Sequence, residues 1–391
     1  MSDQLQTTEA PTTQSPATEA PAHGVVLTDV AAGKVQSLLA QEGRDDLRLR
    51  VGVQPGGCSG LIYQLYFDER TLDGDLVRDF DGVEVVIDRM SAPYLDGATI
   101  DFADTLEIRR GGVAGNICFG MGVLGARPIL IGAAGEDFAD YRSWLSRHGV
   151  VTDHVHISES KHTARFVCTT DDTMAQIATF YAGAMSEARM IELGPIHDKW
   201  KLDLVLIGAD DPEAMLRHTD ECRSGGIPFI ADPSQQLAFA DGPFIRKLID
   251  GADYLFTNEY ESHLTETKTG WSQAEIDDRV TTRVITRGKD GADIRTKGQD
   301  PIHVPIAGDV ERVDPTGVGD AFRAGFLVGL AGGLGYERCG QIGSVLAAHV
   351  LQTDGAQEYV ITRQAFVDHV ATAYGDVAAQ EIAPLVRCAH D

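Results

Sequence analysis

The chain has 391 residues, which at roughly 150 residues per domain predicts two to three domains, or one large α/β domain with an appendage. Hydrophobic residues make up 43% and charged residues 24%, as in soluble globular proteins. No apolar run approaches the roughly 18 residues of a membrane-spanning helix. The net charge of −26 argues against nucleic acid or an anionic membrane as partner, so we expect a cytoplasmic protein that binds small molecules.

The cysteines point to a reducing compartment. The chain has 6, without any C-x-x-C pair, which is too few for a disulfide scaffold. The first residues lack the basic and apolar regions of a secretory signal. Residues 1–22 contain no aromatic residue, Lys or Arg, so we expect a disordered tail, more simply a solvated leader than a partner-binding segment.

A small α+β unit is predicted over residues 23–104. It begins with a short strand and a helix N-capped by Thr28 or Asp29, and continues with alternating apolar and polar segments typical of half-buried strands. The expected apolar face of the helix consists of Val30, Val35, Leu38 and Leu39. A Gly-rich turn at 56–60 holds Cys58, whose thiol can be exposed there. On residue type alone, an inert turn residue is the simpler interpretation.

Three stretches of this unit carry a family resemblance: GVVLTDVAAGKVQSLLAQEG, LRLRVGVQPGGCSGLIYQLYFDE and VEVVIDRMSAPYLDGATIDF. They resemble the A-type iron–sulphur carriers (HesB-like), which implies that Cys58 is a cluster ligand. The family's C-terminal Cys-x-Cys pair has no counterpart here. Because a cluster needs about four ligands, we do not expect this unit to hold an iron–sulphur cluster. A non-enzymatic carrier or scaffold is the alternative function.

From about residue 105 to residue 391 the pattern alternates between β and α. The apolar runs RPILIGAAG, LDLVLIGAD, IPFIADPS, YLFTNEYE and TRVITRGKDG end in polar residues, and helical stretches separate them. This pattern predicts a parallel sheet covered by helices on both faces. Ligands of such sheets bind at the carboxyl ends of the strands, so we expect the functional site there.

One glycine motif is not expected to bind a nucleotide. Gly120, Gly122 and Gly125 satisfy G-x-G-x-x-G, but they follow a helical stretch and precede a strand, the reverse of the dinucleotide-binding order. These glycines more simply allow close helix packing. The chain also lacks the G-x-x-x-x-G-K-[ST] motif of P-loop NTPases.

The strongest signal is the segment Asp314-Pro-Thr-Gly-Val-Gly-Asp320, which opens a helix. Gly317 and Gly319 let several backbone N–H groups point one way, and the helix N-terminus adds partial positive charge. Together they predict an anion hole for the oxygens of a phosphate in transfer. Asp320 lies in the first helical turn, where a carboxylate can accept a proton from an alcohol that attacks phosphorus.

Three weaker motifs favour the same chemistry. Asn258 and Glu261 follow a strand and can serve one solvated Mg²⁺ and its phosphates. Residues 286–291 follow another strand, and their threonine hydroxyl and glycines can contact phosphate or a nucleotide ribose. Gly112 and Asn116 lie where a helix opens, so that a ligand can approach the backbone and the Asn can hold two hydroxyls.

In this order the four motifs resemble the ribokinase-like (PfkB) sugar and nucleoside kinases. The resemblance covers residues 105–391 and implies an α/β ribokinase-like parallel-sheet sandwich that transfers the γ-phosphate of ATP to a CH₂OH group with Mg²⁺. The family's first strand and lid have no counterpart before residue 105, where the carrier-like unit stands. The implied roles are catalysis for Gly317, Val318, Gly319 and Asp320; nucleotide and Mg²⁺ binding for Asn258, Glu261, Thr286, Gly288, Gly291, Asp314 and Thr316; and acceptor binding for Gly112 and Asn116.

The stretches TARFVCTTDDTMAQIATFYAGAMSEAR, ADPSQQLA and LFTNEYE are similar to adenosine kinases of actinobacterial type. The similarity implies that Phe166 and Phe180 clamp a purine by stacking, and that Gln235 and Gln236 lie near the ligands. By residue type, the two phenylalanines could equally be core aromatics on strands. We expect conversion of adenosine to AMP in purine salvage. A ribose or fructose kinase and an inactive fusion are the alternatives, and a homodimer is compatible with the sequence.

Overall fold

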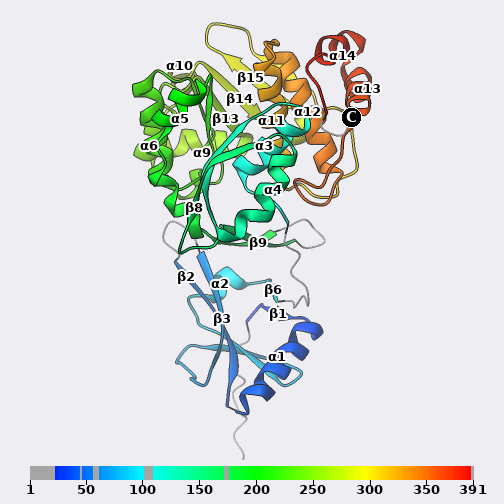
Figure 1. Ribbon diagram of the computed structural model, residues 1–391. Helices are drawn as coiled ribbons and strands as arrows, with labels where there is room; N and C mark the ends of the chain where they lie inside the picture. The colour runs from blue at the N-terminus through cyan, green and yellow to red at the C-terminus, as the bar shows by residue number, and fades with distance from the viewer. Residues whose placement is uncertain (1–22, 45, 56–60, 101–108, 171–175, 389–391) are drawn as a thin grey trace, which may run out of the picture. The chain divides into compact units, whose positions relative to one another are not determined.

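The computed structural model describes residues 23–44, 46–55, 61–100, 109–170 and 176–388. The chain divides into two compact units, residues 1–106 and 107–391, whose elements are labelled in Figure 1. Within the described ranges, no helix combines the length and the apolar character needed to span a membrane.

A four-stranded sheet and one long helix form the first unit. The strand order is β3-β2-β5-β4, in which β2 is antiparallel to β3 and parallel to β5. A separate parallel pair joins β1 to β6. The elements are β1 (Val26–Leu27), α1 (Asp29–Glu42), β2 (Arg48–Pro55), β3 (Leu61–Asp68), β4 (Leu76–Phe80), β5 (Val83–Ile87), α2 (Ala92–Leu95) and β6 (Thr99–Ile100).

Helix α1 begins as predicted, and two of the four residues predicted for its apolar face, Val35 and Leu39, lie on the face that is buried. Thr28 is its N-cap. The side chains that face the core are Ala31, Ala32, Val35 and, partly buried, Leu39. Val30 is 60% exposed and Leu38 36% exposed, because each lies outside this stripe on a helix that turns about 100° per residue. The turn with Cys58 lies outside the described residues.

A six-stranded sheet forms the centre of the second unit. Its order is β11-β12-β13-β14-β15-β16. The first four strands are parallel to one another, β15 is antiparallel to β14, and β16 is antiparallel to β15. The parallel part confirms the predicted α/β fold, and the antiparallel extension adds to it. The strands are β11 (Val205–Ile207), β12 (Phe229–Ala231), β13 (Tyr254–Asn258), β14 (Thr282–Thr286), β15 (Ala292–Thr296) and β16 (Ile302–Val304).

Helices cover both faces of this sheet, as predicted (Figure 1). Neighbouring strand residues alternate between two cores, so that Phe256 joins one and Leu255 the other. The first core includes α3 (Val113–Val123), α4 (Ala139–Arg147), α11 (Val318–Ala331), α12 (Tyr336–Leu351), α13 (Arg363–Tyr374) and α14 (Asp376–Ile382). The second includes α5 (Leu193–Trp200), α6 (Pro212–Gly225), α7 (Gln236–Phe239), α8 (Gly242–Ile249), α9 (Glu259–Thr269) and α10 (Gln273–Arg279).

Two strand pairs lie outside the six-stranded sheet. The strands β7 (Ile129–Gly135) and β8 (Val151–Ser158) are parallel to each other. The strands β9 (Arg165–Thr170) and β10 (Gln176–Tyr181) form an antiparallel pair. This second pair carries the two phenylalanines that the sequence singles out.

The glycines of the G-x-G-x-x-G motif serve helix packing, as predicted. A Cβ at Gly120 would lie 2.8 Å from the Cβ of Ala324 on α11, and one at Gly122 would lie 2.0 Å from the carbonyl oxygen of His148. Helix α3 can therefore approach its neighbours only because these positions lack a side chain.

Candidate active site

A cavity lies at the carboxyl ends of the parallel strands of the second unit. Its volume is about 190 Å³, and its walls come from the segments that follow β12, β13 and β14 and from the start of α11. The lining residues are Ser234, Asn258, Glu261, Thr286, Gly317, Gly319, Asp320 and Arg323. All of these except Ser234 and Arg323 were predicted as site residues.

The loop before α11 has the shape that an anion hole requires. Gly317 is the N-cap of the helix with a φ of 78°, a left-handed conformation that favours glycine. Asp314 fixes the loop by two hydrogen bonds: its Oδ1 accepts the N–H of Thr316 at 2.9 Å, and its Oδ2 accepts the N–H of Gly355 at 3.0 Å. The N–H of Val318 donates to the carbonyl oxygen of Pro315 at 3.3 Å, and the first bond within the helix is that of the Ala321 N–H to Gly317. The N–H groups of residues 319 and 320 therefore have no partner within the helix. They and the helix dipole favour an anion at this point.

Asp320 occupies the first turn of α11, as predicted. Its Oδ2 accepts a hydrogen bond from the Asn116 amide nitrogen at 2.8 Å. Burial raises the pKa of Asp320 to about 6, and the bond from Asn116 and the charge of Arg323 oppose this rise. A carboxylate in the cavity with this pKa is largely ionised at neutral pH and can accept a proton.

Arg323, one turn further along α11, forms a buried ion pair with Asp232. The side chains of Arg323 and Asp232 are only 7% and 0% exposed. One terminal guanidinium nitrogen donates to Asp232 Oδ1 at 2.7 Å, and Nε donates to the other carboxylate oxygen. Arg323 also donates to the carbonyl oxygen of Gly319 at 3.1 Å. The pair therefore ties the end of β12 to the anion-binding loop.

Sequence reasoning missed this ion pair, although a signal for it exists. Beyond its first turn, α11 is apolar except for Arg323. A lone charge in a buried helix demands a buried partner of opposite sign. Asp232, directly after the apolar strand β12, is such a partner.

Asn258 and Glu261 form a capping box at the start of α9. Asn258 Oδ1 accepts the N–H of Glu261, and Glu261 Oε2 accepts the N–H of Asn258, each at 2.7 Å. The N-x-x-E motif therefore also has a structural role at the start of this helix. Burial raises the pKa of Glu261, and the bond from the Asn258 N–H opposes the rise.

The same two residues fit a Mg²⁺ ion that is held mainly by water and phosphate. Mg²⁺ prefers oxygen donors, keeps several waters and uses one or two carboxylates of the protein. Within the described part of the chain, no group of three or more His, Cys, Asp or Glu is placed to hold a metal by itself. An ion at Asn258 and Glu261 would therefore depend on the phosphates of the nucleotide.

The segment 286–291 places only its first residue in the cavity. Thr286 ends β14 and lines the cavity wall. Gly288, with a φ of 55°, begins the following turn and has open space around it. Gly291 has a structural reason to be glycine, because a Cβ there would lie 2.1 Å from the carbonyl oxygen of Val304.

Of the two predicted acceptor residues near α3, Asn116 contacts the Asp320 carboxylate. Gly112 is the N-cap of α3 with a φ of 94°. The side chain of Asn116 is buried and spans two partners: it donates to Asp320 and accepts from Gln357 Nε2 at 2.8 Å. Asn116 therefore holds Asp320 in this structure.

Gln235 and Gln236 do not line the cavity, whereas the preceding residue, Ser234, does. Gln236 Nε2 donates to the backbone oxygen of Asp210 at 2.9 Å, and the exposed Gln235 accepts from the Ser234 hydroxyl at 2.7 Å. Ser234 adopts a positive φ of 46°, which is uncommon for a residue with a side chain.

Phe166 and Phe180 are directly opposite each other in the β9–β10 register. They are 58% and 46% exposed, so the interpretation as core aromatics is wrong. Opposite residues of an antiparallel pair share one face of the ribbon. The two rings can therefore be presented to one ligand from the same side.

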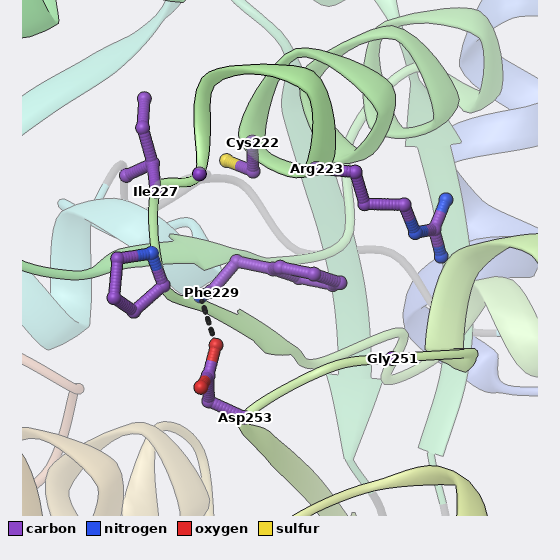
Figure 2. A pocket seen from close by; sticks show the side chains of 8 residues that line it. Cys222, Arg223, Ile227, Phe229, Gly251 and Asp253 are labelled. Atoms are coloured by element: carbon purple, nitrogen blue, oxygen red, sulfur yellow. Dashed lines mark hydrogen bonds between the residues drawn. The ribbon is translucent and has the colours of Figure 1, made fainter.

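A second hollow, of about 310 Å³, lies at the other end of β12 (Figure 2). It is wide open, and its polar groups are used in the fold. Asp253 accepts the N–H of Phe229 at 2.9 Å, and Arg223 donates to the backbone oxygen of Asp250 at 2.6 Å. Cys222 is fully buried, and burial raises its thiol pKa to about 12. The first bond joins the segment before β13 to β12, and the second joins α6 to the end of α8.

Two family models match the chain. The pfkB family of carbohydrate kinases matches residues 84–363, which is more than half of the chain, and iron–sulphur cluster biosynthesis matches residues 24–109. Protein Rv2204c of Mycobacterium tuberculosis is 66% identical over 85 residues, which are 22% of this chain and 72% of that protein.

Nucleoside kinases match the second unit. One from Methanocaldococcus jannaschii is 30% identical over 265 residues, covering 66% of this chain and 85% of that protein. The structure of a Burkholderia thailandensis nucleoside kinase in complex with inosine is 34% identical with a TM-score of 0.67, covering 70% of this chain and 91% of that one. The chain therefore belongs to the pfkB family of carbohydrate kinases, and its N-terminal part to the iron–sulphur cluster biosynthesis family.

Proposed function

We propose that this protein transfers the γ-phosphate of ATP to the 5′-CH₂OH group of a nucleoside, with adenosine as acceptor and AMP as product. The observation that carries the proposal is the placement of Asp320. Its carboxylate, with a pKa raised to about 6, lies in the cavity at the N-terminus of α11. The kinase relatives support transfer to a hydroxyl of a sugar or a nucleoside.

In the proposed reaction, the oxygen of the acceptor hydroxyl attacks the γ-phosphorus, and Asp320 accepts the proton of that hydroxyl. The bond from that phosphorus to the bridging oxygen breaks, and ADP leaves with the electron pair. The backbone N–H groups of residues 317–319 stabilise the charge on the transferring phosphoryl oxygens. Thr286 contributes to nucleotide binding. Asn258 and Glu261 would hold a Mg²⁺ ion through water and phosphate, and the ion would supply positive charge to offset that of the phosphates.

The acceptor is assigned from the aromatic pair on β9 and β10. Two exposed rings on one face cost solvation unless a planar ligand covers them, and a purine provides such a surface. A free sugar offers no comparable face. Because the Burkholderia relative was solved with inosine, inosine is the second candidate acceptor.

An acceptor panel tests the proposal. Purified full-length protein with Mg-ATP is assayed for ADP release with adenosine, inosine, ribose and fructose, and Asp320→Asn serves as the blank. We expect adenosine to give the highest kcat/KM, followed by inosine. Higher values for ribose or fructose would reassign the acceptor class. Rates equal to the blank for every acceptor would contradict the kinase function.

We propose no cluster chemistry for the N-terminal unit. Of the three cysteines that the carrier resemblance requires, the sequence retains Cys58 alone, and a cluster needs about four ligands. Anaerobic addition of iron and sulfide tests this proposal. A stable visible absorbance that is lost in Cys58→Ser would contradict it.

A further inference from the structure

A chain of hydrogen bonds leads away from Asp320 through the buried Asn116 and Gln357 to the partly buried Tyr141. Asn116 donates to Asp320 at 2.8 Å, and its own amide oxygen accepts from Gln357 Nε2 at 2.8 Å. The same Gln357 nitrogen donates to the Tyr141 hydroxyl at 2.5 Å, which in turn donates to the backbone oxygen of Gly111 at 2.9 Å. Gln357 is only 1% exposed and comes from the loop after α12, which no sequence motif singled out.

The chemistry of the donors and acceptors fixes the direction of this chain. An ionised carboxylate only accepts hydrogen bonds, so Asn116 must turn its NH₂ group toward Asp320. Its oxygen then faces Gln357, which must turn its own NH₂ group inward. If Gln357 were unable to donate, only the Asp320 carboxylate would select the orientation of the Asn116 amide, and the amide oxygen would lose its buried partner. The amide would then be held less firmly, and any flipped population would set an oxygen against the Asp320 carboxylate, where two acceptors repel each other.

The loop that carries Gln357 is itself tied to both sides of the site. Asp354 pairs with Arg109, with one guanidinium nitrogen at 2.5 Å from the carboxylate. The N–H of Gly355 donates to Asp314 beneath the anion-binding loop at 3.0 Å. Both bonds fix the backbone of the loop two and three residues before Gln357. The side chain is thus a fixed point against which Asn116 is oriented.

We propose that Gln357 is a positioning residue for phosphoryl transfer, holding Asn116 in the one orientation that points an N–H donor at Asp320. The inference rests on the proposed function, because it takes Asp320 as the base. Gln357 itself does not line the cavity. It therefore acts through Asn116 and not by contact with a substrate.

Other titratable groups also surround Asp320. They are Arg323 on α11, Asp232 after β12, Glu261 on α9, Tyr141 on α4 and Tyr359 after α12. Of these, Tyr141 is the one that Gln357 contacts. Gln357 is uncharged, so its replacement by an apolar residue removes no charge near Asp320, and it acts on the carboxylate chiefly through Asn116, the direct partner. A shift in the acidic limb of the pH profile then reports the orientation of the amide.

The test compares Gln357→Met with Gln341→Met, the same change at a second buried glutamine, on α12. For Gln357→Met we expect the acidic limb of kcat/KM to move up by roughly half to one pH unit, and kcat to fall about tenfold, the equivalent of one lost hydrogen bond. The KM for ATP should stay unchanged. Gln341→Met should keep the wild-type limb and kcat.

A double-mutant cycle with Asn116→Ala isolates the route. If Gln357 acts through Asn116, adding Gln357→Met to Asn116→Ala changes neither the position of the acidic limb nor kcat any further. Additive losses would overturn the inference.

If Gln357→Met does not fold, Gln357→Glu replaces it. The ionised carboxylate of this variant accepts from Asn116 and should flip the amide, so the activity plateau above pH 7 collapses. A wild-type plateau there would equally overturn the inference.

The role of Asp320 as base and the role of Gln357 as positioning residue can be disproved separately. Wild-type turnover by Asp320→Asn would remove the base itself and therefore the proposed function. The role of Gln357 alone would be overturned if Asp320→Asn is inactive while Gln357→Met folds and keeps the wild-type turnover and the wild-type acidic limb of kcat/KM.

Discussion

The carboxyl edge of the six-stranded sheet and the β9–β10 pair differ in how far their candidate functional side chains are buried. At the edge, Asp320 and Arg323 each have a partner within 2.8 Å, from α3 and from the segment after β12 respectively. On β9 and β10, Phe166 and Phe180 are 58% and 46% exposed. Under the proposed function, the groups that would act on phosphate are therefore in place before any ligand binds, whereas the acceptor would complete the aromatic surface.

This contrast separates two kinds of effect. Changes at the edge should alter turnover or stability, because the partners there are buried and fixed. Changes at the β9–β10 pair should alter acceptor affinity and leave the chemical step intact.

The largest effect is expected at the edge, from Asp320→Asn. This change keeps the shape and the contact with Asn116 but removes the base, so kcat should fall by about 10²–10⁴. The KM for ATP should change little. Steady-state assays with adenosine and Mg-ATP provide the measurement, and a kcat within a factor of about three of wild type would exclude Asp320 as the base.

The buried ion pair between Arg323 and Asp232 should make a large difference to the free energy of unfolding of the second unit. Asp232→Ala leaves the buried Arg323 guanidinium without its partner, which costs about 3–5 kcal/mol in the free energy of unfolding. The 3 tryptophans of the chain all lie in this unit, so their fluorescence during denaturation follows it alone. Asp278→Ala breaks an exposed pair with Lys297 and should cost less than about 1 kcal/mol. Equal losses would contradict the account.

At the β9–β10 pair, Phe166→Ala should raise the KM for adenosine roughly tenfold, since stacking on a base contributes about 1–3 kcal/mol. The kcat and the KM for ATP should stay within about twofold of wild type. Tyr181→Ala is the matched control, because Tyr181 follows Phe180 and points to the opposite face. A tenfold rise in both variants would indicate a general loss of the strand pair.

The smallest expected effect concerns stability at the active site itself. Because burial raises the pKa of Asp320 from 3.8 to about 6, its ionised form destabilises the folded state above that pH. Asp320→Asn should therefore raise Tm by roughly 2–4 °C at pH 7.5. The difference should shrink as the pH falls through 6 toward 4. A lower Tm for the variant at pH 7.5 would speak against this strain.

The sequence predicted the parts of the site that depend on local pattern. The glycines and Asp320 follow from the start of one helix, and Asn258 and Thr286 follow from the ends of two strands. Parallel strands bring such ends together, so the cavity could be predicted without long-range information. The helix start that Thr28 caps was predictable for the same local reason.

Long-range partners could not be predicted in this way. Nothing local to Asn116 shows that its amide meets Asp320, or that Gln357, 241 positions further along, orients it. The face of α1 was misjudged in part because Ala31 and Ala32 count little toward an apolar stripe, although small residues let a helix pack closely on a sheet.

The pH dependence of kcat/KM for the acceptor tests the central claim most directly, namely that the Asp320 carboxylate is the base. The account predicts an acidic limb near pH 6 in the wild-type protein, falling about tenfold per pH unit below it, and no such limb in the residual activity of Asp320→Asn. A wild-type profile that is flat from pH 5 to 8, or a limb that persists in the variant, would contradict it.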